Sequence, residues 1–536
     1  MRQELIKIKY RMNIKIIKLI GLCILFFVGC GKDDSIPDEP LSVDVENFDC
    51  SEDTRLTVQI ETIINPTGYA PLSAMVSLQA NKSIRVDMRI LGRNGEDSDV
   101  IKNFPETGST IEIPVHGLYP DYENEVELTF FDINDTQLCS AMLKVQTDPL
   151  ISDMPQIQID KAERAQMTTG MTLVNYYGYD QDINPFRPFM FDSYGDIRWY
   201  LDFKSSPILN NLHFDDGPHR LANGNFFFGN NEPDAIYEVD LFGNIVDTWE
   251  MPGFRFHHEV LEKPNGNFIV SVDKIGITTI EDYIIEIDRD SKEIIRIWDL
   301  NESLDNTRTT LTQNREDWIH VNAVSYDQSD DTIIISGRTQ GVVKLSATNE
   351  VICIIAPHRE WNIAGNGEDL NQFLLQPLDA TGAPITDQSI LDGFQNHSDF
   401  EWNWYQHAAR VLADGTITLF DNGDNRNFTT FGPYSRAVRY KIDQNNKTIQ
   451  QIWEYGKDRG SEIYSRIVSD VDYLEDTNHM LISPGAIVTG SQPMGKSIEV
   501  DIATNTIIFE ASIIPPNAFA NQITFHRTDR LSLYPD

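Results

Sequence analysis

The fold is indicated by the stretch Tyr194-Gly195-Asp196-Ile197-Arg198-Trp199, a turn followed by a strand that ends in tryptophan. The same pattern of a turn and an apolar strand recurs at residues 243–249, 292–298, 349–354, 447–453 and 505–509. Counted from the second turn residue, the steps are 48, 49, 57, 98 and 58 residues. Steps near 50 residues are typical of propeller blades, and the step of 98 indicates a long insertion or a missed copy. Six copies is the simpler count.

A second series of turns lies between these copies. It consists of Asn223-Gly224-Asn225, Asn265-Gly266-Asn267, Asp330-Asp331 and Asp414-Gly415, and apolar strands follow most of them. Such turns are hairpin signals, and two hairpins per repeat make a four-stranded blade. The sequence therefore predicts an all-β chain with a six-bladed β-propeller over residues 151–536.

The region before the propeller has a different pattern. Residues 49–150 contain short runs with alternating apolar and polar side chains, such as 56–60, 83–88 and 125–130. Alternation with a period of two and turns at this spacing predict a small N-terminal β-sandwich.

The first 48 residues have the features of an export signal and a tether. Basic residues precede an apolar run from Leu19 to Val28, which is too short to span a bilayer. Phe27-Val28-Gly29-Cys30 resembles a bacterial lipobox, which implies that residues 1–29 are removed and that Cys30 carries lipid. Residues 30–48 are acidic and predict a tether, with the protein anchored in the bacterial outer membrane, on its periplasmic side or at the cell surface. Cys50 and Cys139 fall within the predicted sandwich and could pair in an oxidising compartment.

Composition limits the partners without indicating a reaction. The chain has 536 residues, 82 of them acidic and 43 basic, for a formal charge of −39. A nucleic acid partner is excluded because phosphate backbones are bound by dense Lys and Arg. An apolar fraction of 40% is too high for a disordered acidic chain.

The histidines recur at related positions in different repeats. His258, in the pair His257-His258, lies eight residues before Gly266, and His407 lies eight residues before Gly415. His320 lies eleven residues before Asp331, which indicates a longer hairpin. Equivalent positions in different blades face the same region of the axis, so we expect these imidazoles to meet there.

Two polar residues are expected to join the histidines. Asn322 follows His320 closely, and Arg338 belongs to the strand after the next turn. Together they would form a donor-rich cradle for an anion with several oxygens. Considered without the histidines, Arg338 would be expected to form an ion pair with one of the many carboxylates of the chain. A metal is not predicted, because ligand pairs such as His-x-x-x-His are absent and the loop 421–426 lacks the full ladder of a calcium site. A Gly-x-Ser-x-Gly elbow is also absent, which disfavours a serine hydrolase.

At these residues the chain resembles the bacterial aryl-sulfate sulfotransferase family, the type that does not use an adenosine phosphosulfate donor. The motifs are residues 65–72 and 116–122 in the sandwich, then 257–258, 317–322, 336–338, 406–407 and 420–423 in the propeller. Their order across two domains makes the resemblance specific.

The resemblance implies that a sulfuryl group passes from an aryl sulfate to a phenol through a sulfated histidine, without a cofactor. His407 matches the nucleophile, and His258 and His320 match catalytic positions, of which either could be the general acid and base. His257, Asn322 and Arg338 match substrate-binding positions. A propeller that only binds sulfated or other anionic ligands, and a sulfate-ester hydrolase, are the alternatives. The sequence leaves open whether the protein forms a homodimer.

One departure from the family concerns the loop before His407. The best-known members have a short-range disulfide there, whereas residues 358–406 contain no cysteine. The aromatic residues Phe400, Trp402, Trp404 and Tyr405 are expected to hold the loop by core packing, or else to line a phenol pocket.

Overall fold

The computed structural model describes residues 44–50, 55–176, 186–212, 219–231, 234–429, 432, 434–489, 492–516 and 523–535. The predicted signal peptide, Cys30 and most of the tether lie outside these residues. In the part of the chain that is described, no helix has the length and apolar character needed to cross a membrane. The structure is all-β, with two single-turn α-helices, α1 (Leu300–Ser303) and α2 (Gln388–Leu391), as the prediction of fold class requires.

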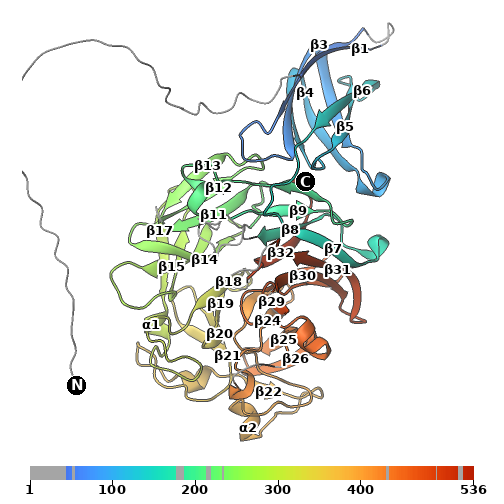
Figure 1. Ribbon diagram of the computed structural model, residues 1–536. Coiled ribbons are helices and arrows are strands. Elements are labelled where there is room, and N and C mark those ends of the chain that lie inside the picture. Colours follow the sequence, from blue (N-terminus) through green and yellow to red (C-terminus); the bar gives the residue numbers. More distant parts are fainter. Residues whose placement is uncertain are drawn as a thin grey trace, which may run out of the picture. The chain divides into compact units, whose positions relative to one another are not determined.

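The N-terminal domain is built on two long antiparallel strands (Figure 1). Its strands are β1 (Asp44–Asp49), β2 (Thr57–Ile64), β3 (Ser73–Ile90), β4 (Val100–His116), β5 (Glu123–Phe131) and β6 (Gln137–Gln146). The first half of β3 pairs with β2 and its second half pairs with β5, while β4 runs along the other edge. The side chains of β3 alternate between buried and accessible, so the predicted period of two is observed.

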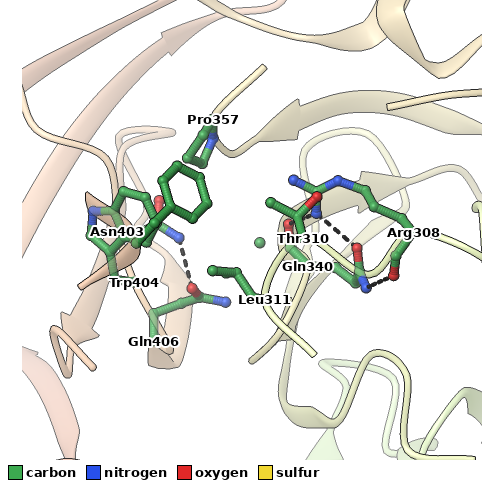
Figure 2. Close-up of a pocket in the computed structure, with 10 residues that line it drawn as sticks. Arg308, Thr310, Leu311, Gln340, Pro357, Asn403, Trp404 and Gln406 are labelled. Carbon is green, nitrogen blue, oxygen red and sulfur yellow. Dashed lines mark hydrogen bonds between the residues drawn. The ribbon is translucent and has the colours of Figure 1, made fainter. Parts of the chain in front are cut away.

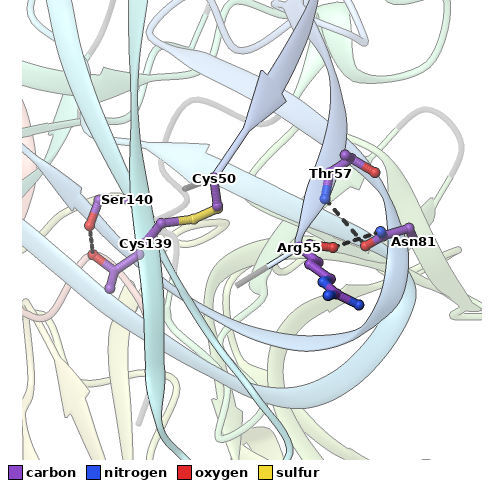
Figure 3. The surroundings of a disulfide bond; sticks show 7 residues. Cys50, Arg55, Thr57, Asn81, Cys139 and Ser140 are labelled. Atoms are coloured by element: carbon purple, nitrogen blue, oxygen red, sulfur yellow. Dashed lines mark hydrogen bonds between the residues drawn. A yellow bond between two sulfur atoms is a disulfide. The ribbon is translucent and has the colours of Figure 1, made fainter. Parts of the chain in front are cut away.

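A disulfide closes this domain. Cys50 and Cys139 are joined, with their Cα atoms 6.0 Å apart and a sequence separation of 89 (Figure 3). Cys139 lies on β6, so the bond ties the segment after β1 to the opposite end of the strand path. The pairing that the sequence suggested is therefore present.

Beyond residue 155, the described strands form six further sheets. The first is β10 (Ile197–Tyr200), β9 (Phe189–Phe191), β8 (Met171–Tyr176) and β32 (Phe525–Leu531), and the second is β11 (Phe226–Asn231), β12 (Asp234–Val239) and β13 (Ile245–Glu250). The third is β14 (Phe254–Glu262), β15 (Phe268–Lys274), β16 (Tyr283–Ile287) and β17 (Ile294–Asp299), and the fourth is β18 (Val321–Asp327), β19 (Thr332–Gly337), β20 (Gly341–Leu345) and β21 (Val351–Ile355).

The last two sheets complete the series. The fifth is β22 (Gln376–Leu378), β26 (Thr448–Tyr455), β25 (Arg436–Asp443), β24 (Ile417–Asp421) and β23 (His407–Val411). The sixth is β27 (Asp470–Leu474), β28 (His479–Ser483), β30 (Gln492–Asp501), β31 (Thr506–Ile514) and β7 (Gln156–Ala162), with β29 (Ile487–Thr489) paired to β30.

Strands from the two ends of this region close the series of sheets. β7 pairs with β31, and β8 pairs with the C-terminal strand β32 (Figure 1). The sixth sheet thus contains a strand from the start of the region, and the first sheet contains its last strand. Such pairing removes free sheet edges between the beginning and the end of the chain.

The repeated tryptophans link successive sheets. Each donates its indole N–H to the turn at the start of the next copy of the repeat. The bonds are Trp199 to the carbonyl of Leu241 (2.9 Å), Trp249 to that of Arg289 (2.9 Å), Trp298 to that of Ser346 (2.8 Å) and Trp453 to Oδ1 of Asn505 (2.8 Å). The tryptophan that recurs in the sequence therefore forms a hydrogen bond between neighbouring sheets.

The step of 98 residues is an insertion. Residues 356–406, which are described throughout, contain β22, α2 and the short 3-10 helix η4 (Leu370–Phe373). β22 pairs in parallel with the outer strand β26, so the insertion lies along the edge of the fifth sheet. It contains no further sheet.

Arg198, from the repeat that indicates the fold, anchors the N-terminal domain to the first of the six sheets. Its side chain is fully buried. Nε donates to the carbonyl of Gly117 (2.8 Å), and Nη1 donates to the Tyr119 hydroxyl (2.9 Å) and to Asp192 (3.0 Å). A buried guanidinium whose Nε and Nη1 donate to groups of both domains makes this junction specific.

Candidate active site

Several residues of the site lie at irregularities in strands that are at one end of their sheets. His258, Asn322, His407 and His526 each occupy, or lie within, a shift of strand register. Bulges of this kind turn a side chain out of the regular alternation and are common beside active sites. β14 contacts β18, and β18 contacts β23, so these strands bring their irregularities together.

The histidines form a compact buried cluster. The ring of His258 lies 4.2 Å from His257, 5.5 Å from His320 and 5.3 Å from His526, measured between centroids. Burial lowers the pKa of His258 well below its ordinary value, and the neighbouring imidazoles add to this effect. His258 is therefore neutral at physiological pH. The structure brings His257, His258 and His320 together, and it adds His526, which the sequence analysis missed.

His407 is held in a defined tautomer by Asn422. Nδ2 of Asn422 donates to the carbonyls of Ser465 (2.8 Å) and Val468 (2.9 Å), so the amide orientation is set by the backbone. Oδ1 of Asn422 lies 2.8 Å from Nδ1 of His407 and can only accept a hydrogen bond. The proton of the neutral imidazole is therefore on Nδ1, and the lone pair is on Nε2.

The protonation state of His407 suits a nucleophile. Its side chain is buried, and burial lowers its pKa well below the ordinary value. The charge of Arg338 lowers the pKa further, while the bond to Asn422 opposes the shift. His407 therefore remains neutral, with the Nε2 lone pair available, over the physiological range of pH.

His320 has the opposite surroundings, because two carboxylates face its Nδ1. One belongs to Glu281, and the other to Asp317 at 3.1 Å. Glu281 also lies 3.2 Å from Nε2 of His257. Burial alone would raise the pKa of Glu281, but the charges and hydrogen bonds of His257 and His320 outweigh it and lower the pKa. Glu281 is thus an ionised partner for two imidazoles, and the sequence analysis did not identify it.

Arg338 interacts electrostatically with this acidic pair and with His407. Its Nη2 is 3.9 Å from Asp317, so the ion pair that its residue type favours is present but loose. Burial lowers the pKa of Arg338, and the charges of Asp317 and Glu281 oppose this. Because its charge acts on His407, the guanidinium is placed to face an anion bound there.

Several residues of the site have left-handed backbone conformations. The φ angles are 83° at His258, 59° at Glu281, 54° at His320, 52° at Tyr405 and 55° at Ala408. Such conformations are costly for residues other than glycine and are concentrated at functional sites. Here they are imposed on His258 and His320, on Ala408, which follows His407, and on Tyr405, two residues before it.

The loop before His407 is held by buried aromatic rings and hydrogen bonds. Trp402 and Trp404 are almost fully buried in a shared core, and Asp421 accepts a hydrogen bond from the backbone N–H of Trp404 (2.9 Å). Asn322 donates to the carbonyl of Gln406 (2.8 Å). Asn322 therefore supports the backbone of the nucleophile directly.

A cavity behind this loop is too small for a phenol. Figure 2 shows Trp404 and Gln406 on one side of it and Arg308 and Gln340 on the other. Its volume of 10 Å³ is about that of one water probe. Of the two roles considered for the aromatic residues, core packing is the one observed for Trp402 and Trp404.

The described residues include a group that could hold a cation. Glu281, Asp317 and His320 bring ligand atoms within 4.8 Å of one another. These atoms already face one another as hydrogen-bond partners, and Arg338 places a positive charge beside Asp317. The carboxylates of this group are therefore already paired with His320 and Arg338, which disfavours a metal ion there.

Comparison with known proteins decides the family. The model described as "Arylsulfotransferase (ASST)" matches residues 156–520, and "Arylsulfotransferase Ig-like domain" matches residues 61–148. The chain belongs to the arylsulfotransferase family. Arylsulfate sulfotransferase AssT of Escherichia coli O6:H1 is 29% identical, and the alignment covers 84% of this chain and 90% of that protein. The AssT of Lelliottia amnigena is 27% identical over the same shares of the two chains.

Among solved structures, the selenomethionine-substituted virginiamycin B lyase from Staphylococcus aureus covers 81% of this arylsulfotransferase, with 100% of its own chain aligned. The TM-score is 0.30 at 9% identity, which is a distant likeness. The family assignment therefore depends on the sequence matches, which span both the Ig-like domain and the six sheets. By this family membership the protein is a sulfotransferase.

Proposed function

We propose that this arylsulfotransferase moves a sulfuryl group from an aryl sulfate to a phenol through a sulfated His407, and that its six sheets are the blades of a six-bladed propeller. The observation that carries the mechanism is the bond from Nδ1 of His407 to Asn422, which leaves the lone pair on Nε2. The low pKa of His407 supports the same role, because the imidazole is not protonated in the resting site.

In the first half-reaction, Nε2 of His407 attacks the sulfur, the N–S bond forms, and the bond from sulfur to the aryl oxygen breaks. The charge that is shared over the sulfuryl oxygens is stabilised by Arg338. The leaving phenolate takes a proton from His320. We assign this role to His320 because its Nδ1 faces the carboxylates of Glu281 and Asp317, whereas burial disfavours the protonated form of His258.

In the second half-reaction, neutral His320 removes the proton of the incoming phenol. The phenol oxygen attacks sulfur, the N–S bond breaks, and His407 returns to its neutral state. The buried imidazoles of His257, His258 and His526 surround the site and limit the access of water. Limited access of water favours transfer over hydrolysis.

The test is transfer from p-nitrophenyl sulfate to phenol by the purified protein. Wild type is expected to form phenyl sulfate, and His407→Ala is expected to lose transfer. His397→Ala is the matched control, because His397 lies in a turn where its Nδ1 accepts from the backbone of Asp399. Full transfer by His407→Ala would end the proposal. Release of sulfate without phenyl sulfate would instead assign a hydrolase, and neither product would assign a binding protein.

We also propose that the protein is exported and anchored by lipid on Cys30. The lipobox-like sequence supports the anchor, and the Cys50–Cys139 disulfide supports an oxidising compartment. Cys30→Ser is expected to move the protein out of the membrane fraction. Protease treatment of intact cells distinguishes the cell surface from the periplasmic side, since only a surface protein is cleaved.

A further inference from the structure

Arg466 lies on a loop that is fastened to the support of His407. The carbonyls of Ser465 and Val468, on either side of it, accept the two hydrogen bonds from Asn422. Asn422 in turn holds Nδ1 of His407 at 2.8 Å. The backbone of Arg466 is therefore fixed close to the nucleophile. Its side chain is 53% exposed, in contrast to the buried side chains of the histidine cluster.

The guanidinium of Arg466 has a weak partner. Nη1 lies 3.5 Å from Oδ2 of Asp424, and the two side chains differ sharply in burial, since that of Asp424 is only 8% exposed. Asp424 follows Asn422 by two residues, so both members of the pair are carried by the segments that hold His407. Among the residues that the structure describes, this one contact leaves most donors of Arg466 available to an anion.

Arg466 is also close to the groups that face the reaction. Burial lowers the pKa of Arg338, and the charge of Arg466 is near enough to lower it further. Burial raises the pKa of Tyr405, while the charges of Arg338 and Arg466 oppose this shift. Arg466 is more exposed than Arg338, whose side chain is 22% exposed. The two cations thus lie at different depths beside the nucleophile.

An aryl sulfate is an anion, so its approach to His407 calls for a positively charged group near the site. The chain carries a formal charge of −39, which repels the negatively charged sulfate ester at long range. We propose that Arg466 recruits the aryl sulfate anion, exchanging its contact with Asp424 for the sulfate oxygens before Arg338 receives them. This inference deepens the proposed function, on which it rests. It assigns to Arg466 a role in binding the donor and none in the acceptor step, because a phenol is neutral below its pKa near 10.

Two substitutions test the proposal by breaking one ion pair with opposite changes of charge. Arg466→Gln removes a positive charge, and Asp424→Asn removes a negative one. Recruitment predicts that kcat/KM for p-nitrophenyl sulfate falls roughly three- to ten-fold in Arg466→Gln and rises about two-fold or more in Asp424→Asn at low salt. Both effects should shrink as ionic strength increases, and the KM for phenol should stay unchanged.

A purely structural ion pair predicts another result. Both variants would then change kcat/KM in the same direction, with little dependence on salt, and that outcome overturns the proposal, as does the absence of any effect. Arg55→Gln is the matched control, because it makes the same change of net charge at an exposed position in the N-terminal domain. Melting temperatures of the variants check their folding. His407→Ala, measured in parallel, tests the nucleophile separately, so the failure of one idea is distinguishable from the failure of the other.

Discussion

Replacing Asn422 tests how the lone pair of His407 is positioned. Asn422→Ala leaves the Nδ1–H of His407 without its 2.8 Å acceptor and leaves the carbonyls of Ser465 and Val468 without their donor. An orphaned buried donor costs about 1–3 kcal/mol, which corresponds to roughly a five- to 150-fold loss of kcat. The carbonyl of Tyr405, 3.3 Å from Nδ1, remains as a poorer acceptor. We therefore expect the lower half of this range.

The assay is single-turnover release of p-nitrophenol, with thermal unfolding measured on the same samples. Asn422→Asp is the informative partner, since its carboxylate still accepts from Nδ1 but no longer donates to the two carbonyls. We expect Asn422→Asp to retain more of the first half-reaction than Asn422→Ala, even though both are less stable than wild type. Wild-type single-turnover rates in Asn422→Ala, with the loss confined to stability, would refute the reasoning.

Three further outcomes are expected. Glu281→Gln should lower kcat roughly 10- to 100-fold, because His320 loses a carboxylate that faces its Nδ1. The loss should be larger for phenyl sulfate than for p-nitrophenyl sulfate, because a basic leaving group needs a proton most, and equal losses for both donors would argue against this role. Cys50→Ser with Cys139→Ser should destabilise the N-terminal domain by up to about 4 kcal/mol, seen as a lower denaturation midpoint, since the bond closes a loop of 89 residues. Burial lowers the pKa of His116 to about 3, so the unfolded state binds its proton more readily and stability falls as pH decreases from about 6.5. His116→Gln should reduce that slope by up to about 1.4 kcal/mol per pH unit in unfolding titrations, and an unchanged slope would contradict the assignment.

Part of the site was predictable because repeats place equivalent residues on the same side of the molecule. The shared offset of eight residues located His258 and His407 before any contact was known. The structure adds the physical cause, which is a register shift in β14 and in β23 at these residues. The repeated turn and tryptophan were equally informative about the fold, since Trp249 and Trp298 bond to the next sheet in succession.

The rest of the site depended on long-range pairing. His526 lies on the C-terminal strand β32, which joins the first sheet by pairing with β8. Because this strand is far in sequence from the rest of its sheet, the spacing of the repeats does not predict where His526 lies. Glu281 precedes β16 on a segment without a repeated motif. Asn422 belongs to the loop 421–426 and was given no role of its own, because its hydrogen bonds connect residues that are 15, 43 and 46 positions away. None of these contacts has a local signal.

The central claim is that His407 carries the sulfuryl group during the reaction. Intact-mass and peptide measurements after rapid mixing with p-nitrophenyl sulfate, without acceptor, test it directly. The account predicts the mass of one added sulfuryl group, located on the peptide that contains His407 and lost when phenol is added. Transfer to phenol at the wild-type rate with no adduct on this peptide would contradict it.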